Sequence, residues 1–472
     1  MKSSSWRFPP AFWTANLIEL CERAAYYGWF IMLAPFLTDV VHYTDIQAGF
    51  IGGIFAALLY FLPFLTGAFA DRVGYRRALL LALALLSVGY LGIGSVPRKH
   101  WVLLSMLFIM VGGALVKPII TGTVARSSDA AHRARAFSLF YMMVNIGSFF
   151  GKTAAAPVRI HAGLATMPLC SAAVALVALC IVALFYFPKA HPEEDRHAAL
   201  TVRQAWHRLI SDLKEVLRSG RLMAIVLISA GFWIIQSQLY SSMPKYVLRI
   251  VGNDASPEWY ANINPIMVML LVVPITHLSR KLTPMASIAL AMALIPLSSL
   301  IVAVMPPFLG TVSLPDALRV GPFAGAAGLF HPVTLAMGMG IAAQGLAECF
   351  LSPRYLEYAS KQAPPGKEAL YMGYAHMNNF FAWLVGYILS GYLLDAFCPD
   401  PSRLDAATRL AYEAALRGQG PMPAAYAHAH YLWYVFAGVG AVAFVFLIVF
   451  QRLTHRTPDA EMGEPQAAPS PG

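Results

Sequence analysis

The sequence predicts an all-α membrane protein with twelve transmembrane helices arranged as two pseudo-symmetric six-helix bundles. Three observations support this fold class. Of the 472 residues, 58% are hydrophobic and only 12% are charged, whereas a soluble domain is typically about one quarter charged. The apolar residues gather in long segments. A polar, basic stretch near the middle of the chain divides these segments into two equal sets.

The apolar segments have the length that a membrane-spanning helix needs. A bilayer core of about 30 Å is crossed by roughly 20 apolar residues in a helix. Twelve segments meet this requirement: 11–37, 46–70, 78–96, 101–124, 136–157, 163–187, 221–244, 258–279, 284–306, 331–351, 371–395 and 430–451. We interpret the first as an uncleaved span, because it is too long for a signal peptide and no clear cleavage site follows.

The polar stretch defines the domain organisation. Apolar positions within residues 191–220 fit an amphipathic helix that lies on the cytoplasmic surface of the membrane. We therefore expect an N-terminal bundle at 1–190, this linker, a C-terminal bundle at 221–456 and a disordered cytoplasmic tail at 457–472. Paired bundles place a binding site between them, near the midplane. The apolar loop 306–330 is long enough for a membrane-embedded hairpin, which the sequence leaves open.

The net charge of +10 reflects membrane topology rather than nucleic-acid binding. Most of the 34 Lys and Arg residues fall in loops on one side of the predicted bilayer, which is the positive-inside pattern. We expect a multi-pass protein of a bacterial inner (plasma) membrane with both termini in the cytoplasm. The five cysteines show no metal-ligand spacing, and no nucleophile elbow or phosphate-binding loop is present. The sequence therefore predicts no enzyme activity, no metal and no cofactor.

Charged residues inside the first apolar segment are the strongest functional signal. Glu19, Glu22, Arg23 and Tyr26 are spaced at i, i+3, i+4 and i+7, which places them on one face of a helix. A charge within a bilayer costs several kcal/mol by cautious scales, on the order of 3 kcal/mol each, so it usually faces a bundle interior or a water-filled cavity. The pattern predicts that the helices surround a polar path.

The loop between the second and third predicted helices carries a recognisable motif. It reads Gly67-Ala-Phe-Ala-Asp71-Arg72-Val-Gly74-Tyr-Arg76. This resembles the loop signature of the major facilitator superfamily, Gly-x-x-x-Asp-Arg-x-Gly followed by basic residues. Glycine permits a tight turn and close helix approach, and an acid can pair with arginines or a helix N-terminus. The resemblance implies the major facilitator fold, with these five residues in a cytoplasmic gate.

A narrower resemblance covers most of the chain. Motifs in six places, in the right order, resemble those of the proton-dependent oligopeptide transporters: Glu19-x-x-Glu22-Arg23-x-x-Tyr26-Tyr27-Gly28, Lys117-Pro118, Phe137 to Gly147 around Tyr141 and Asn145, Phe232-Trp233, Asn264-Pro265 and Glu348-x-x-x-Ser352-Pro353. The first- and fifth-helix motifs are specific, and the others are weak alone. The chain is identified as an atypical member of that family.

The resemblance implies roles for these residues. Proton coupling is assigned to Glu19, Glu22, Arg23, Lys117 and Glu348, with Glu22 and Lys117 as a switch pair. The family pattern places a peptide carboxylate near Arg23 and Lys117, and the peptide amino group near Asn145, Asn264 and Glu348. The full set of candidate substrate-binding residues is Arg23, Tyr26, Tyr27, Tyr60, Lys117, Asn145, Lys152, Trp233, Asn264, Glu348 and His376. The six intramembrane charges in these sets, Lys152 included, sum to zero, as a low-dielectric cavity demands.

Several positions depart from the family pattern. Phe30 occupies the position of a second arginine, and the seventh helix has Gln236-Ser237-Gln238 in place of an acid. The second helix has no basic residue, so the gate between these two helices is expected to be lost as a unit. Lys152 and His376 are additional polar groups.

Two transport hypotheses follow. The first is proton-coupled symport of short peptides or peptide-like zwitterions by alternating access, by a monomer driven only by the proton gradient. The second is transport of another amphipathic or carboxylate-rich metabolite, such as a peptidic natural product or siderophore, with export also open. A sensor that keeps the fold without flux is the rival from another class.

Structural alternatives stay open for single residues. Glu19, Glu22 and Arg23 could form a purely structural buried network. Lys152 could extend to the membrane interface, and Glu348 could pair with Arg354. The side chains of His376, Asn145 and Asn264 could serve only helix packing.

Overall fold

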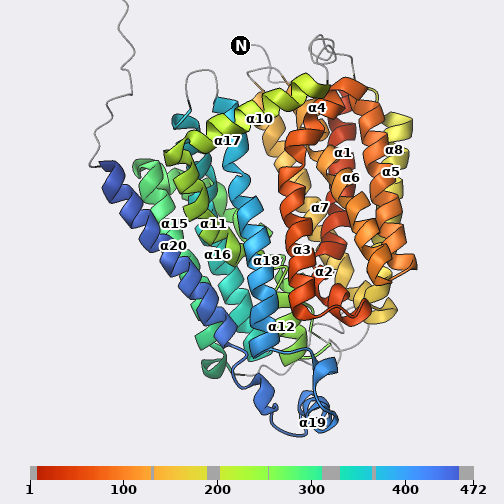
Figure 1. Cartoon of the computed structure of the whole chain (residues 1–472), viewed down its shortest axis with the longest axis vertical. Coiled ribbons are helices and arrows are strands. Elements are labelled where there is room, and N and C mark those ends of the chain that lie inside the picture. Colours follow the sequence, from red (N-terminus) through yellow and green to blue (C-terminus); the bar gives the residue numbers. More distant parts are fainter. Residues whose placement is uncertain are drawn as a thin grey trace, which may run out of the picture.

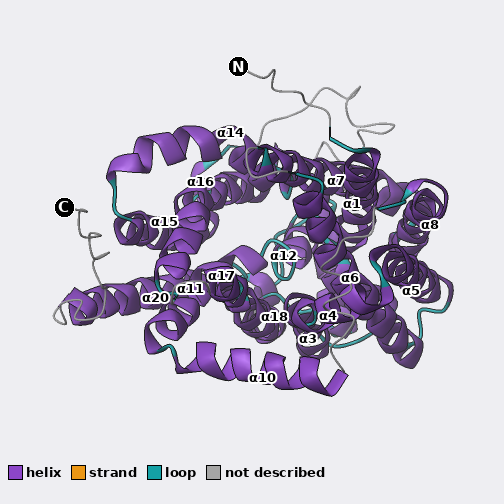
Figure 2. Ribbon diagram, turned by 90° about the horizontal axis from the view of Figure 1, so that it is seen from above, coloured by secondary structure: helices purple, strands orange, loops and turns teal. Residues whose placement is uncertain are grey.

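The computed structural model describes residues 8–128, 132–188, 202–253, 255–310, 330–363 and 368–455. Within these ranges the regular structure is helical and contains no strand. The N-terminal and C-terminal halves of the chain form two groups of helices that stand side by side (Figure 1) and enclose a common central region when seen from above (Figure 2). The predicted all-α class is confirmed.

The first half begins with a long helix and contains five further long elements. Its helices are α1 (Pro10–Phe30), α2 (Leu33–Pro35), the π-helix η1 (Phe36–Val40), α3 (Asp45–Phe61), α4 (Pro63–Val73), α5 (Tyr75–Ser95), α6 (Lys99–Arg126), α7 (Arg133–Ala162), the 3₁₀ helix η2 (Leu164–Thr166) and α8 (Met167–Phe185).

The linker and the second half follow. Their helices are α10 (Val202–Arg218), α11 (Gly220–Ser237), α12 (Met243–Ile250), α13 (Pro257–Tyr260), α14 (Ile263–Leu278), η3 (Ser279–Lys281), α15 (Pro284–Val304), η4 (Pro306–Phe308), α16 (Pro332–Lys361), α17 (Glu368–Ala375), α18 (Met377–Phe397), η7 (Pro401–Arg403), α19 (Ala406–Leu416), η8 (Ala424–Tyr426) and α20 (Tyr431–His455). Most of the loop 306–330 lies outside the described residues, and so does the hairpin that the sequence leaves open.

Ten helical segments within the described ranges are long and apolar enough to cross a membrane. Two further long helices, α1 and α7, stand among them and carry the polar groups of the first- and fifth-helix motifs. Together these elements account for the twelve predicted spans. The chain is thus a multi-pass membrane protein.

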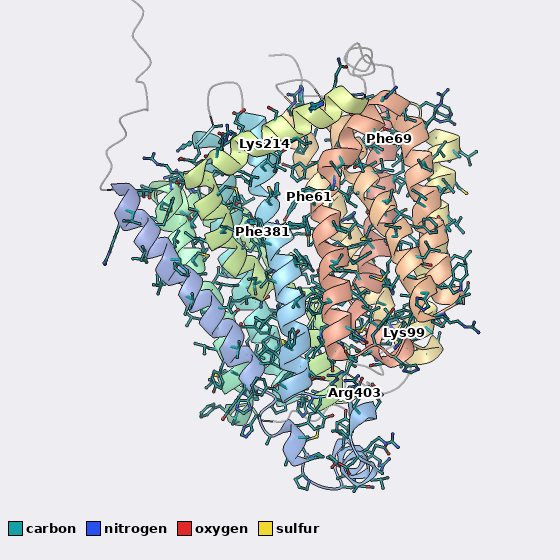
Figure 3. The ribbon with its side chains drawn as sticks, viewed as in Figure 1. Phe61, Phe69, Lys99, Lys214, Phe381 and Arg403 are labelled. Carbon is teal, nitrogen blue, oxygen red and sulfur yellow. The ribbon has the colours of Figure 1, made fainter. Side chains whose placement is uncertain are left out.

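The helix array has two ends, which we call the linker end and the far end. Lys214 of α10 marks the linker end, where α10 runs across both halves and contacts α4, α11 and α17 (Figure 3). Lys99 and Arg403 mark the opposite end, called the far end (Figure 3). The amphipathic helix expected within 191–220 therefore exists as α10 and bridges the two halves.

Some predicted spans are broken helices. The span predicted at 46–70 is divided into α3 and α4 at Leu62. Pro63 begins α4, because proline has no N–H to continue the helical hydrogen bonds of α3 but fits the first turn of a new helix. The span at 221–244 likewise ends in a turn at 238–242, and α17 is separated from α18 at His376.

Two prolines inside long helices leave backbone carbonyls that other residues bind. Proline removes the hydrogen bond to the carbonyl four residues earlier. Pro118 in α6 frees the carbonyl of Ala114, four residues earlier. This carbonyl accepts a hydrogen bond from the Thr66 hydroxyl of the same half at 2.7 Å. Pro157 in α7 likewise frees the carbonyl of Thr153, which accepts a hydrogen bond from the indole N–H of Trp259 in the second half at 3.1 Å.

The two halves meet most closely between α3 and α18. A Cβ atom on Gly49 would lie 2.6 Å from the carbonyl oxygen of Tyr387, and one on Gly391 would lie 2.6 Å from the carbonyl oxygen of Asp45. Only glycine permits such backbone contact. Nearer the linker end the halves are joined between α4 and α17, where the rings of Phe64 and Tyr374 are stacked at 4.9 Å.

Candidate functional site

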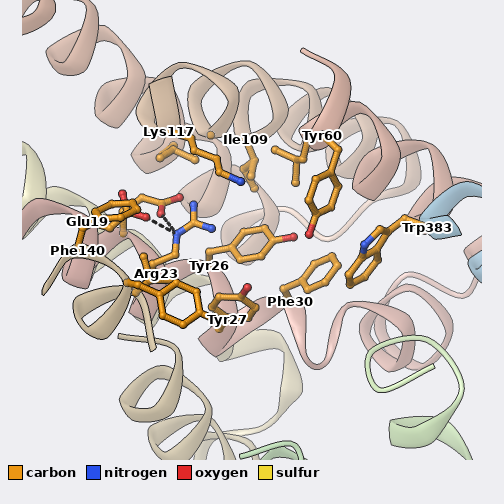
Figure 4. A pocket seen from close by; sticks show the side chains of 16 residues that line it. Glu19, Arg23, Tyr26, Tyr27, Phe30, Tyr60, Ile109, Lys117, Phe140 and Trp383 are labelled. Carbon is orange, nitrogen blue, oxygen red and sulfur yellow. Dashed lines mark hydrogen bonds and ion pairs between the residues drawn. The ribbon is translucent and has the colours of Figure 1, made fainter. Parts of the chain in front are cut away.

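A cavity of about 210 Å³ lies where the two halves meet (Figure 4). Its walls come from α1, α3, α5, α6 and α7 of the first half and from α18 of the second. The lining residues are Glu19, Glu22, Arg23, Tyr26, Tyr27, Phe30, Leu59, Tyr60, Leu86, Ile109, Gly113, Lys117, Phe140, Tyr141, Val144 and Trp383. The stripe of charges along the first helix therefore faces a single cavity, as its spacing predicts.

The two glutamates of α1 share one arginine. The Nε atom of Arg23 lies 2.5 Å from Glu22 and 3.3 Å from Glu19, and both carboxylates are 2% exposed. The Arg23 guanidinium also lies 5.3 Å from the Tyr26 ring centre and 6.0 Å from that of Tyr27. One oxygen of Glu19, Oε2, is buried without a hydrogen-bond partner among the described residues. A buried acceptor in that position is suited to hold a proton.

Lys117 is the cation of the cavity that has no ion pair in the described part of the chain. Its side chain is exposed to the cavity, and its Nζ lies 5.7 Å from the ring centre of Tyr60. His376 is also exposed and lies within electrostatic range of Lys117. The expected pair between Lys117 and Glu22 is not formed in this conformation. Glu22 instead binds Arg23, its neighbour on the same helix.

Glu348 of α16 lies outside the cavity lining and is held by two amides. Its Oε2 atom accepts hydrogen bonds from Gln236 at 3.0 Å and from Asn264 at 3.2 Å. Arg354 pairs with Glu357 at 2.7 Å, so the alternative of a Glu348–Arg354 pair is wrong. Asn264 thus bonds across helices to Glu348, and Gln236 is a partner that the sequence reasoning did not assign.

The remaining predicted residues are placed apart from the cavity lining. Asn145 donates to the Tyr141 carbonyl within α7 at 2.8 Å. The Trp233 indole nitrogen is buried without a partner among the described residues. Lys152 is 1% exposed, and its Nζ donates to the Ala261 carbonyl of the second half at 3.1 Å. The alternative that Lys152 extends to the membrane interface is therefore wrong.

A buried ion cluster joins the halves at the far end. Asp45, at the start of α3, contacts Lys245 at 2.7 Å and Arg249 at 3.0 Å. Arg249 also donates to the Cys398 carbonyl at 2.6 Å and lies 3.8 Å from Asp400. The base on the second helix and the acid on the seventh that the family pattern implies are absent, as expected, but a charge pair of opposite polarity joins the same helices at other positions. The pair exists with the acid on α3 and the bases on α12, the continuation of α11 beyond its turn.

A second polar contact joins α7 to the segment before α14. Arg159 binds Glu258 at 2.6 Å and the carbonyls of Ala255 and Asn253 at 2.5 and 2.9 Å. With Asp45 and its partners, these bonds join the two halves at the far end. We call the two sets the far-end contacts. Sequence reasoning missed both, because an acid at a helix start is usually a local cap.

The motif loop occupies the linker end. Gly74 has φ of 90°, which allows the turn between α4 and α5. A Cβ on Gly67 would lie 3.8 Å from Pro118, which is an ordinary van der Waals contact, so the approach of α4 to α6 does not require glycine at this position. Arg76 donates to the Ala183 carbonyl at 2.9 Å, and Arg72 is exposed. The predicted role of the Asp71 side chain lies outside what the structure describes.

The fold and this loop define a class of membrane transporter. Residues 17–318 match the family model of the Major Facilitator Superfamily. The chain belongs to the Major Facilitator Superfamily, which confirms the predicted fold and agrees with the prediction that it is not an enzyme.

Particular relatives are peptide permeases. The chain is 34% identical over 155 residues to dipeptide and tripeptide permease A of Yersinia pestis, a match that covers 32% of this chain and 31% of that protein. It is 29% identical over 248 residues to dipeptide and tripeptide permease B of Salmonella typhimurium, covering 52% and 48%. The matches to the first of these curated relatives span about a third of their length.

Solved structures share the fold over nearly the whole chain. A peptide transporter POT in complex with sulfate superposes with a TM-score of 0.67 at 20% identity, covering 96% of each chain. The POT family transporter PepTSo superposes at 0.68 with 17% identity, covering 96% and 99%. A tetrameric form of PepTSo2 gives 0.67 at 21% identity, covering 95% and 99%. These similarities establish the architecture.

Proposed function

We propose that this chain is a proton-coupled secondary active transporter that carries short peptides or peptide-like zwitterions by alternating access. The observation that carries the proposal is the cavity, which is lined both by Lys117, a cation without an ion pair among the described residues, and by the Glu19–Glu22–Arg23 cluster. The permease names of the relatives and the superfamily membership support the same function.

Proton and substrate binding are linked through Arg23 in this proposal. While both glutamates are ionised, they occupy the guanidinium of Arg23. A proton on Glu19 or Glu22 removes one of these attractions and releases Arg23 toward the cavity. Arg23 and Lys117 then bind a substrate carboxylate as two cations. We further propose that Glu348 of the second half, whose Oε2 accepts hydrogen bonds from Gln236 and Asn264, would bind the substrate ammonium.

Alternating access follows from where the interface is closed. The far-end contacts hold the halves together through buried ion pairs, whereas the contacts near the linker end include stacked rings such as Phe64 on Tyr374. We assign the linker end to the cytoplasm of a bacterial inner membrane, with both termini on that side. Residues 1–190 and 221–456 would rock against each other around the cavity. We further propose that a monomer is sufficient and that the proton gradient is the only energy source.

Uptake into proteoliposomes tests proton coupling. Purified protein is reconstituted, a pH gradient is imposed, and accumulation of labelled Ala-Ala is compared with its exchange at equal pH. The Glu22→Gln variant is expected to abolish gradient-driven accumulation, because a neutral amide can neither bind a proton nor release Arg23. Glu357→Gln is the matched control, since Glu357 pairs with Arg354 and Lys361 away from the cavity. Accumulation that is unchanged in Glu22→Gln would show that coupling does not run through this residue.

Competition experiments test the substrate class. Lys117→Gln should weaken Ala-Ala binding roughly tenfold or more, because a charge-assisted hydrogen bond of about 1.5–3 kcal/mol is lost. Lys361→Gln is the control at a surface lysine. If Ala-Ala and a broad dipeptide mixture neither bind nor compete in the wild type, peptide transport is wrong.

A further inference from the structure

Helix α10 (Val202–Arg218) lies at the rim of the molecule, at the linker end. Seen from above, it runs along the outer edge of the helix array rather than over its centre (Figure 2), and seen from the side it crosses both halves (Figure 1). It contacts α4 of the first half and α11 and α17 of the second. Because the array spans a bilayer, a helix at its rim and at one end lies at the level of the lipid headgroups.

One face of α10 packs on the protein. Val216 is fully buried, and Leu213 packs against the hydrophobic core. These two residues are three apart, so they share one face of the helix. The face on the other side of α10 is exposed.

The exposed face of α10 consists of three neighbouring stripes. Residues seven apart lie on one stripe of a helix, and the positions three and four residues further on lie on the stripes to either side. The exposed side chains form an apolar, a basic and a polar stripe, which are Ile210 with Leu217, His207 with Lys214, and Ser211 with Arg218. The apolar pair is 41% and 47% exposed. The basic stripe therefore lies between the apolar stripe and the polar one.

This order of stripes matches the layers of a membrane surface. A helix in the interface buries its apolar side at the boundary of the acyl chains and keeps its polar side in water. Lys214, between the two sides, then lies at the level of the lipid phosphates, and Arg218 lies next to it on the polar side. Lysine and arginine both form charge-assisted hydrogen bonds with phosphate.

The charge of α10 favours anionic over zwitterionic lipids. Its sequence contains four Lys and Arg residues against two acids, namely Arg203, Arg208, Lys214 and Arg218 against Asp212 and Glu215. Basic residues near a membrane surface are attracted to anionic headgroups. A soluble phosphate would satisfy the cations but leave the adjoining apolar stripe in water, whereas a phospholipid covers both.

We infer that α10 binds an anionic phospholipid of the adjacent leaflet, with Lys214 and Arg218 at the headgroup phosphate and Ile210 and Leu217 at the acyl chains. The site lies at the rim of the molecule, apart from the cavity between the halves, and does not depend on the transported substrate.

Native mass spectrometry of the full chain in detergent tests this inference. The dissociation constant of the first bound phosphatidylglycerol is compared with that of phosphatidylcholine with the same acyl chains. We expect phosphatidylglycerol to bind roughly 30-fold more tightly to the wild type, because each of two cations contributes roughly fivefold. The double variant Lys214→Gln, Arg218→Gln should lose this preference and leave phosphatidylcholine binding unchanged.

The matched control is the double variant Arg409→Gln, Arg417→Gln. Both arginines are exposed on α19 or directly after it, and α19 lies beyond the helix array at the far end (Figure 1). This variant removes the same amount of charge and should keep the preference for phosphatidylglycerol.

Three results would overturn the inference. The first is equal affinity of the wild type for the two lipids. The second is a loss of preference in the control as large as in the α10 variant, which would show attraction to overall positive charge. The third is displacement of phosphatidylglycerol by glycerol phosphate at equal concentration, which would identify a soluble phosphate as the occupant. Peptide transport is tested separately by uptake into proteoliposomes, so the two proposals can fail independently.

Discussion

Neutralising Asp45 should open the far end of the protein. The carboxylate of Asp45 is 1% exposed and binds Lys245 and Arg249, which are 3% and 5% exposed. Asp45→Asn keeps the shape of the side chain and removes its charge. Two buried cations then face a neutral amide while the far end is closed. When the far end is open, both cations are hydrated, so the substitution penalises the closed state selectively.

The size of the effect follows from the burial of the cluster. Removing one partner of a buried ion pair costs about 3–5 kcal/mol. Because about 1.4 kcal/mol changes an equilibrium tenfold, the ratio of closed to open far end should fall by roughly 10²- to 4 × 10³-fold. Asp400, 3.8 Å from Arg249, retains part of the neutralising charge and favours the lower value. A shift of this size can convert a closed population into one that is largely open.

Distance measurements between spin labels can detect this change. Lys99 and Arg403 are exposed and mark the far ends of the first and second halves (Figure 3). Labels at these positions should show a longer distance population in Asp45→Asn. Asp405→Asn is the matched control, since it makes the same chemical change at the same end and asparagine still caps a helix start. Identical distance distributions for Asp45→Asn and the wild type would refute the assignment of this cluster as a far-end closure.

Two further predictions concern helix packing. Thr66→Val should lower the free energy of unfolding by about 1–3 kcal/mol in thermal unfolding, because it leaves the Ala114 carbonyl, which Pro118 frees, without a donor. The loss should be smaller in a Pro118→Ala background. Equal losses in both backgrounds would contradict the explanation. Gly49→Ala should hold α3 away from α18 and so change the distances between the far-end labels, because its Cβ would lie 2.6 Å from the Tyr387 carbonyl oxygen. Gly438→Ala is the control and should leave these distances unchanged, because no atom lies within 4 Å of its Cβ.

The sequence was sufficient for the spans and for the cluster on the first helix. Hydrophobic length identifies a transmembrane helix because the bilayer imposes one thickness on every span. Glu19, Glu22 and Arg23 were assigned to one face because helical periodicity is local. Even the break at Leu62 has a readable cause in Pro63. These features depend on neighbours that are close in sequence.

The pairing of charges could not be predicted in the same way. Asp45 and Lys245 are 200 residues apart, and each resembles an ordinary residue at a helix end. Glu22 was expected to bind Lys117, but Arg23 is closer and competes for the same carboxylate. Such choices depend on side-chain geometry between packed helices, which a residue pattern does not specify.

The balance of charges at the cavity has an electrical consequence. Glu19, Glu22, Arg23 and Lys117 provide equal numbers of acidic and basic groups. Under the proposed function, a zwitterionic substrate adds no net charge, whereas each bound proton adds one. The loaded carrier then moves charge through the membrane potential, about 2.3 kcal/mol per charge for 100 mV. The empty carrier returns without that electrical work, so an inside-negative voltage favours accumulation even when the pH is equal on both sides.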